Sequence, residues 1–407
     1  MYATGRLTRR TPPQMYPHPP PYDPLALDAF AALAGPRVWA TRMAEIHVRA
    51  ASGPRAGRLL RQRHAVELAI ERLRCGPSRP PFPAELHAAR LAGEAILLSR
   101  SLNAAGRRRL RESLRAGLGG DGTLIPLFHL LRTAALQTAR GFSVTFPALE
   151  DDAPYDLLIS RDASQAEVAC QVVSAEQGRL VARDAWVQLA DRVSGDAQAW
   201  LSAHPGCHLL KMTLPQGLQA NTLAAMHARI RRLLQADRRQ DHDEAGMLRL
   251  EPLLLAGKQP EEDLLHCLRS EFGPEAHLAI TAADAGVFVM AARPGQVDQV
   301  GTTVHRNLQE IANRRLSGSR PGILAIFIED IDRADWFGLR DSLSLEGEAR
   351  RFLAHRTARN VVAVTCTSRF ELFGLSDAAE DGELRFRNSA HPAAKAVSLA
   401  PAILSSV

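Results

Sequence analysis

The sequence predicts an α/β fold, in which an N-terminal helical region precedes an α-β-β-β core and further strands and helices. Apolar residues recur at helical spacing up to about residue 122, and beyond it strand-length apolar runs alternate with helical patterns. Hydrophobic residues make up 46% and charged residues 23% of the 407-residue chain, which is typical of a folded protein. No apolar run approaches the ~18 residues of a membrane span, and no secretory signal is readable. We therefore expect a cytoplasmic protein with no membrane partner.

The N-terminal third divides into a leader and a helical region. Residues 1–23 are so rich in proline that we expect a disordered leader, because proline lacks the backbone donor that helices and sheets need. Residues 24–122 form the predicted basic helical region. Its helical patterns run over 26–33, 38–50, 58–74, 84–99 and 104–116.

Residues 123–375 form the predicted α/β domain. A helix over 124–139 precedes a strand over 142–146 and a hairpin of strands over 155–160 and 166–174. Later helices are expected over 179–203, 222–235, 261–271, 297–316 and 346–355, and later strands over 207–214, 247–255, 277–281, 286–291, 322–328 and 361–367. Residues 376–407 lose this periodicity, so we expect a poorly ordered tail.

Positive charge is concentrated in the N-terminal part of the chain. Residues 1–122 carry 20 arginines and no lysine against 9 acidic residues, an excess of 11 positive charges, although the whole chain has a net charge of only +6. Arg107, Arg108, Arg109 and Arg111 lie on one predicted helix. They are candidates for binding the phosphates of DNA or RNA, and the alternative is a solvated helix face.

The predicted hairpin contains a recognisable pattern. The stretches GFSVTFP, PYDLLI and AEVACQVVSAEQGR resemble the α-β-β-β core of the PD-(D/E)XK (restriction-endonuclease-like) nuclease superfamily, in particular its uncharacterised bacterial members. Asp156 takes the place of the motif aspartate, and Gln171 takes the place of the motif lysine. Ala169 stands where the family has its second acid, so this resemblance implies a degenerate active site.

The resemblance implies metal-dependent chemistry only if a second acid is supplied. Family members hold Mg²⁺ between two carboxylates, and Ala169 cannot bind a metal. Alternating strand residues share a face, so Glu167, Ala169 and Gln171 are expected to face Asp156. Glu167 could then act as a migrated ligand, although it lies ~6–7 Å farther along the strand.

Two further groups of charged residues are candidates for binding. In the resembled family, residues equivalent to Arg179 and Arg183 lie beside the active face, where they could meet a phosphate; otherwise they face solvent at a helix start. An acidic group follows the predicted strand over 322–328, where α/β proteins commonly bind ligands. It consists of Glu329, Asp330, Asp332 and Asp335, and it forms either a metal site or a solvated loop. The five cysteines are far apart and indicate neither a disulfide framework nor a zinc site.

Three functions remain open from the sequence. We expect first a catalytically degenerate protein that binds nucleic acid or a protein partner without cleavage and needs no cofactor. The second is a Mg²⁺-dependent endonuclease that uses Asp156 and Glu167 as metal ligands together with Gln171. The third is a purely structural α/β scaffold.

Overall fold

The computed structural model describes residues 22–76, 79–253, 268, 272, 276–296, 298–374, 379 and 382–405. Almost all of the proline-rich leader and of the predicted helix over 261–271 lies outside these residues. The predicted α/β class is confirmed, because two mixed sheets alternate with helices. Within the described residues, no helix combines the length and the apolarity that a membrane crossing needs.

The N-terminal region is helical, as its periodicity predicts. Its helices are α1 (Pro24–Ala34), α2 (Pro36–Ala50), α3 (Pro54–Arg63), α4 (Ala65–Arg74), α5 (Pro83–Ser101) and α6 (Ala104–Gly117). Several begin with proline, whose fixed φ suits the first helical position. Their apolar stripes pack around Phe30 and Trp39 and join Phe128 of α7 (Ile125–Ala139) in one core. Because Phe327 belongs to the same core, the helical region is packed onto the adjoining sheet.

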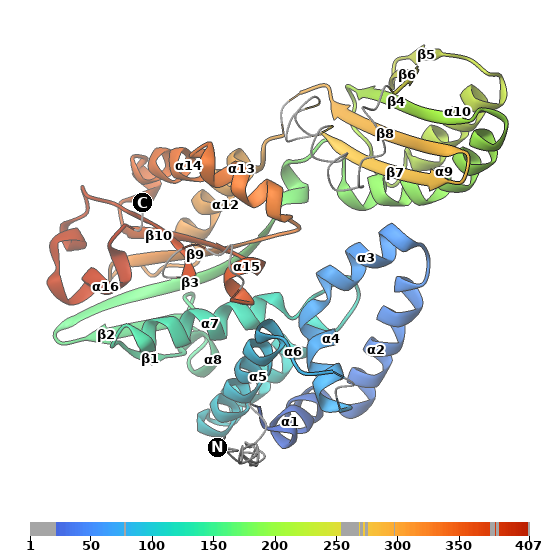
Figure 1. Cartoon of the computed structure of the whole chain (residues 1–407). Helices are drawn as coiled ribbons and strands as arrows, with labels where there is room; N and C mark the ends of the chain where they lie inside the picture. Colours follow the sequence, from blue (N-terminus) through green and yellow to red (C-terminus); the bar gives the residue numbers. More distant parts are fainter. Residues whose placement is uncertain are drawn as a thin grey trace, which may run out of the picture.

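The main sheet is mixed. Its described strands lie in the order β1 (Ser143–Thr145), β2 (Leu157–Arg161), β3 (Ser164–Ser174), β9 (Gly322–Glu329), β10 (Val361–Ser368) and β11 (Leu384–Arg387). Strands β3, β9 and β10 are parallel, and the outer strands pair antiparallel to them. Helix α7 covers one face, while α12 (Val300–Arg314) and α14 (Ser344–Leu353) cover the other (Figure 1). Shorter helices connect these elements: α8 (Pro147–Glu150), α13 (Arg333–Asp341), α15 (Arg369–Leu372) and the 3₁₀ turns Ala175–Gly178 and Arg356–Ala358.

The predicted hairpin of β2 and β3 is confirmed. Leu157 pairs with Val168, so the preceding Asp156 lies opposite Ala169. Ala169 is fully buried and packs in the core beneath α12, whereas Val168 packs in the core beneath α7. The face shared by Glu167, Ala169 and Gln171 is therefore the α12 face of the sheet.

A second α/β unit is inserted between β3 and α12. It contains α9 (Arg183–Ala203), β4 (Gly206–Leu214), α10 (Leu223–Gln235), β5 (Gln240–Asp243), β6 (Gly246–Pro252), β7 (His277–Ala283) and β8 (Gly286–Pro294). Its described strands lie in the order β5-β6-β4-β8-β7, and α9 and α10 pack on one face of this sheet. The α/β part of the chain thus contains two separate sheets (Figure 1), and the first of them extends past residue 375 to include β11. Periodicity does not reveal this division, because both sheets are built from the same element types.

The inserted unit is attached to both neighbouring parts of the chain. Its two connections to the main sheet meet where the Gln299 amide donates to the Gly178 carbonyl at 2.7 Å. Asp191 of α9 accepts from the first backbone amides of α3, including that of Ala56 at 2.9 Å, and pairs with Arg55. An acid at a helix N-terminus stabilises the unpaired amides there. Asp191 therefore fixes the inserted unit against the helical region.

The C-terminal segment differs from the predicted poorly ordered tail over residues 382–405. Strand β11 pairs with β10, and the chain then forms 3₁₀ turns over Pro392–Lys395 and Val397–Leu399 and helix α16 (Ala400–Ile403). Leu399 and Ile403 are buried against the main sheet. A short edge strand and single turns have too few residues for a periodic pattern, which is why the sequence did not indicate them.

Candidate functional site

Asp156 is held by the protein's own groups. Its two carboxylate oxygens accept from Arg315 Nη2 at 2.7 and 2.8 Å, and Oδ2 also accepts from the Cys170 amide at 2.7 Å. Arg315 directly follows α12, and its Nε donates to the Pro154 carbonyl. Burial raises the pKa of Asp156 above its ordinary value, and the Arg315 charge opposes that rise. Asp156 is therefore one half of an ion pair that is largely removed from solvent.

Glu167 is held in the same way. The side chain is fully buried, Oε2 accepts from the Ser317 amide at 2.8 Å, and Oε1 accepts from the Ser317 hydroxyl. Arg320 Nη1 lies 3.6 Å from Oε1. The segment between α12 and β9 thus supplies partners for both carboxylates. Gln171, farther along β3, donates to the Val172 carbonyl at 3.2 Å.

The arrangement at Asp156 and Glu167 does not fit the magnesium ion that the family resemblance implies. Each carboxylate oxygen of the two residues already accepts from a protein donor, and Ala169 between them offers no oxygen. A search of the described residues for three or more metal-ligating side chains around one point finds no such group. We therefore derive no metal-dependent step from these residues.

The second charged region lies at the carboxyl ends of β3, β9 and β10. Arg179 is almost fully buried, donates to Asp335 and the Asp330 carbonyl, and lies beside Glu176 and Asp298. Arg183 pairs with Asp332. The predicted arginine pair and acidic group therefore neutralise one another across the junction with the inserted unit, instead of facing open solvent.

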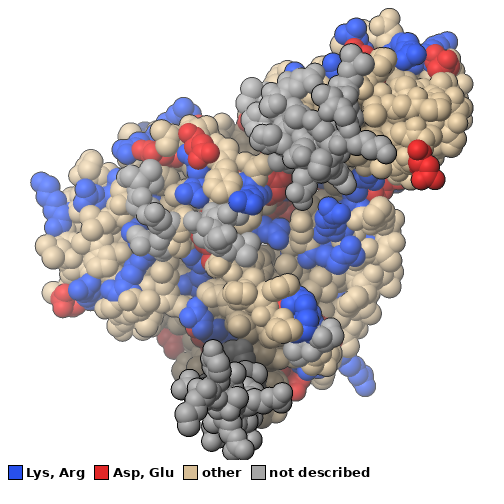
Figure 2. Space-filling model, in the orientation of Figure 1, with Lys and Arg blue, Asp and Glu red and all other residues tan. Residues whose placement is uncertain are grey.

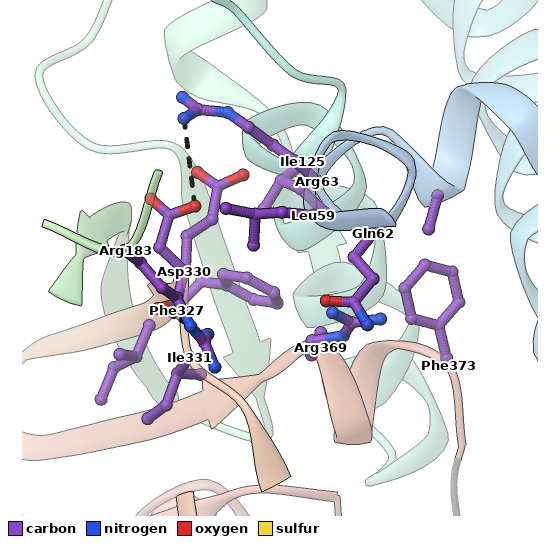
Figure 3. Close-up of a pocket in the computed structure, with 13 residues that line it drawn as sticks. Leu59, Gln62, Arg63, Ile125, Arg183, Phe327, Asp330, Ile331, Arg369 and Phe373 are labelled. Atoms are coloured by element: carbon purple, nitrogen blue, oxygen red, sulfur yellow. Dashed lines mark hydrogen bonds and ion pairs between the residues drawn. The ribbon is translucent and has the colours of Figure 1, made fainter. Parts of the chain in front are cut away.

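A small hollow opens beside these ion pairs (Figure 3). Helix α3 contributes Leu59, Gln62 and Arg63, the end of β9 contributes Glu329 and Asp330, and α15 contributes Arg369. The remaining lining residues are Ala65, Ile125, Arg183, Phe327, Ile328, Ile331 and Phe373. The hollow thus combines apolar walls with acidic and basic groups at the end of a parallel sheet, where α/β proteins commonly bind ligands.

Two titratable groups in the hollow have shifted pKa values. Burial, reinforced by the neighbouring Asp330, raises the pKa of Glu329 to about 7. Burial and the nearby Arg183 charge lower the pKa of Arg369. These shifts mark groups whose charged forms are poorly solvated, which is common at functional sites.

The predicted nucleic-acid-binding arginines of α6 are not equivalent. Arg107, Arg108 and Arg111 are exposed, whereas Arg109 is half-buried and donates to the Leu149 carbonyl at 2.7 Å. Helix α3 presents a further basic surface, because its sequence PRAGRLLRQR contains four arginines and no acid. Lysine and arginine side chains gather over α3 and beside α13 in Figure 2.

Comparison of the chain with protein-family models, with curated proteins and with solved structures finds no match. The choice of candidate residues therefore depends on the geometry of the structure alone. Sequence reasoning missed Arg315, Ser317 and Arg320, which are close to Asp156 or Glu167 only after folding. It also missed Arg369, although the rule that selected Glu329 would have found it, since both residues lie at the carboxyl end of a parallel strand.

Proposed function

We propose that the chain is a non-cleaving, cytoplasmic nucleic-acid-binding protein with a restriction-endonuclease-like core. The observation that carries the proposal is the ion pair of Asp156 with Arg315 beside the buried Ala169. In this arrangement an arginine supplies the positive charge that a metal ion supplies in a nuclease of this superfamily. The order α7-β1-α8-β2-β3, in which only the single-turn helix α8 interrupts an α-β-β-β sequence, also supports the core assignment.

Binding is proposed to use the arginines of α3 and α6. Arg58, Arg107 and Arg111 are exposed, and no hydrogen bond or ion pair is found for their side chains within the described residues. Arg61 and Arg63 are also exposed on α3 and donate only to backbone carbonyls at 3.3 Å, apart from a 4.0 Å ion pair between Arg63 and Asp330. Long exposed arginines of this kind neutralise phosphates without reading base sequence.

The test is the salt dependence of binding to a short DNA duplex. The logarithm of the affinity should fall with the logarithm of the salt concentration, with a slope of about −0.9 for each phosphate neutralised. Replacing Arg107, Arg108 and Arg111 with glutamine, and separately Arg58 and Arg61, should flatten that slope. Arg231→Gln, on the exposed side of α10, is the matched control and should leave the slope unchanged. A wild-type protein that binds no duplex or single strand at low salt would contradict the proposal.

A cleavage assay separates this proposal from the endonuclease alternative. The wild-type protein should not cut plasmid DNA in Mg²⁺ or Mn²⁺, because Arg315, Ser317 and Arg320 already hold both carboxylates. Metal-dependent cleavage that Glu167→Gln abolishes would instead establish the migrated-carboxylate nuclease.

A further inference from the structure

The hollow at the ends of the parallel strands has the size of a small ion. Its volume is about 40 Å³. One water needs roughly 10–15 Å³ of such space, so the hollow admits a group of a few non-hydrogen atoms. It lies between α3 of the helical region and α15 at the sheet, and Figure 3 shows the Gln62 amide of α3 beside the Arg369 guanidinium.

Arg369 is the unusual member of this lining. Within the described part of the chain, no hydrogen bond or ion pair is found for its guanidinium, although the side chain is only partly exposed. Other poorly exposed arginines nearby behave differently, since Arg179 and Arg183 each bind carboxylates. A poorly solvated guanidinium without an acceptor is unfavourable and is stabilised by an anion.

A second cation, Arg183, lies near Arg369. Arg183 lines the hollow, and its charge contributes to lowering the pKa of Arg369, so the two guanidinium groups repel each other. Arg63 also lines the hollow, but its guanidinium is turned toward Asp330, 4.0 Å away, and not toward Arg369 (Figure 3). The Gln62 amide lies beside Arg369 and supplies an uncharged donor. An anion in the hollow would relieve the repulsion and bridge elements from both parts of the molecule.

The two acids of the lining are compatible with an anion. Asp330 Oδ2 accepts from the Ser174 hydroxyl at 2.6 Å, and Oδ1 lies near Arg63. Asp330 also adopts a positive φ of 58°, and in this conformation its carbonyl accepts from Arg179 at 2.8 Å. Glu329 holds a proton in a large fraction of molecules at neutral pH, because its pKa is about 7. A protonated carboxyl can donate to an anion.

We propose that this hollow is a binding site for a phosphate-sized dianion, of the kind that a phosphate monoester presents, held by Arg369 together with Arg183. Guanidinium groups bind tetrahedral oxyanions through paired N–H donors, which makes arginine suited to this role. The site is separate from the exposed arginines of α6, so it stands whether or not that helix binds nucleic acid.

The test is a titration of the full-length protein with sulfate by calorimetry, with the unfolding temperature as a second readout. Sulfate keeps its charge between about pH 6 and pH 8, so any pH dependence belongs to the protein. We expect saturable binding that Arg369→Gln weakens about tenfold or more, as the loss of a charge-assisted hydrogen bond predicts. Arg231→Gln is the control and should bind sulfate as the wild type does.

Two further readouts distinguish a ligand-binding arginine from a structural one. In anion-free buffer, Arg369→Gln should unfold at the same temperature as the wild type or higher, because it removes a poorly solvated charge that no described residue binds by a hydrogen bond or an ion pair. Sulfate affinity should also fall as the pH rises from about 6 to 8 while Glu329 loses its proton, and Glu329→Gln should remove that dependence.

The source of the phosphate is tested with single-stranded oligonucleotides. A 5′-phosphorylated strand that binds more tightly than its 5′-hydroxyl counterpart, with the difference lost in Arg369→Gln, would identify a nucleic-acid end as the ligand. Equal binding of both strands together with saturable orthophosphate binding would identify a small phosphate ester. Absence of saturable sulfate and orthophosphate binding, unchanged sulfate affinity in Arg369→Gln, or strong destabilisation by that substitution would overturn the proposal.

Discussion

Two charged regions of the main sheet differ in how their charges are compensated. Around β2 and β3, Asp156 and Glu167 each have an arginine from the segment after α12 as their partner. At the carboxyl ends of the parallel strands, Arg179 and Arg183 are paired, whereas no hydrogen bond or ion pair is found for the Arg369 guanidinium among the described residues. Asp156 and Glu167 are thus bound by the protein's own groups, whereas Arg369 is the residue that we propose binds a ligand.

The largest effect is expected at Ala169. Ala169→Glu places a carboxylate in a fully buried position beneath α12, so it should lower the free energy of unfolding by about 3–5 kcal/mol. Urea denaturation measures the loss, and Ala163→Glu in the exposed turn between β2 and β3 is the control. If Mn²⁺ restored the lost stability, the new carboxylate and Asp156 would share a metal ion. The region around β2 and β3 would then be able to bind a ligand, as we propose for the hollow.

The next effect is expected at Arg315. Arg315→Gln leaves Asp156 with a raised pKa, little solvent and no cationic partner, so the free energy of unfolding should fall by about 2–3 kcal/mol at neutral pH. The loss should shrink in acid, where Asp156 becomes protonated. Arg314→Gln changes the exposed neighbouring residue and should have little effect in the same urea titration. Equal stability of the two variants would mean that the Asp156 pair is not structural.

A pH-dependent effect is expected at the carboxyl ends of the strands. The pKa of Glu329 is about 7 in the folded protein and close to 4.5 when unfolded, so the folded state binds more protons between these values. The contribution of Glu329 to stability should therefore fall as the pH rises from about 4.5 to 7, by about 2–3 kcal/mol. Urea titrations across this range should show a shallower pH dependence for Glu329→Gln. Parallel curves for the variant and the wild type would mean that Glu329 does not titrate in this pH range and does not contribute to the pH dependence of anion binding.

The smallest effect is expected on α6, where Arg109 donates to backbone carbonyls and Arg108 has only an exposed ion pair. Arg109→Gln removes donors to the Leu149 and Glu150 carbonyls and should lower the free energy of unfolding by about 1 kcal/mol. Arg108→Gln should leave stability nearly unchanged, because its pair with Glu112 is exposed. Duplex binding should show the opposite order, with Arg108→Gln weakening it more than Arg109→Gln. If the same variant had the larger effect in both measurements, α6 would not use Arg109 for stability and Arg108 for DNA binding.

Several features of the site could be predicted from the sequence. The β2–β3 hairpin and the common face of Glu167, Ala169 and Gln171 follow from strand alternation and a short turn, which are local properties. The position of Glu329 and Asp330 at a strand end follows from the length of the apolar run before them. The insertion of a second sheet could not be predicted, because periodicity identifies elements and does not say which sheet each strand joins.

The α/β class, the basic helices and the alternation of Glu167, Ala169 and Gln171 along one strand follow from local sequence patterns. The partners of the charged side chains follow from the tertiary fold, because they come from far along the chain. Arg315 reaches Asp156 across 159 positions, and Arg63 meets Asp330 across the interface between the helical region and the sheet. The physical reason is that the properties of a buried charge depend on the groups packed around it, and packing is settled by the whole fold.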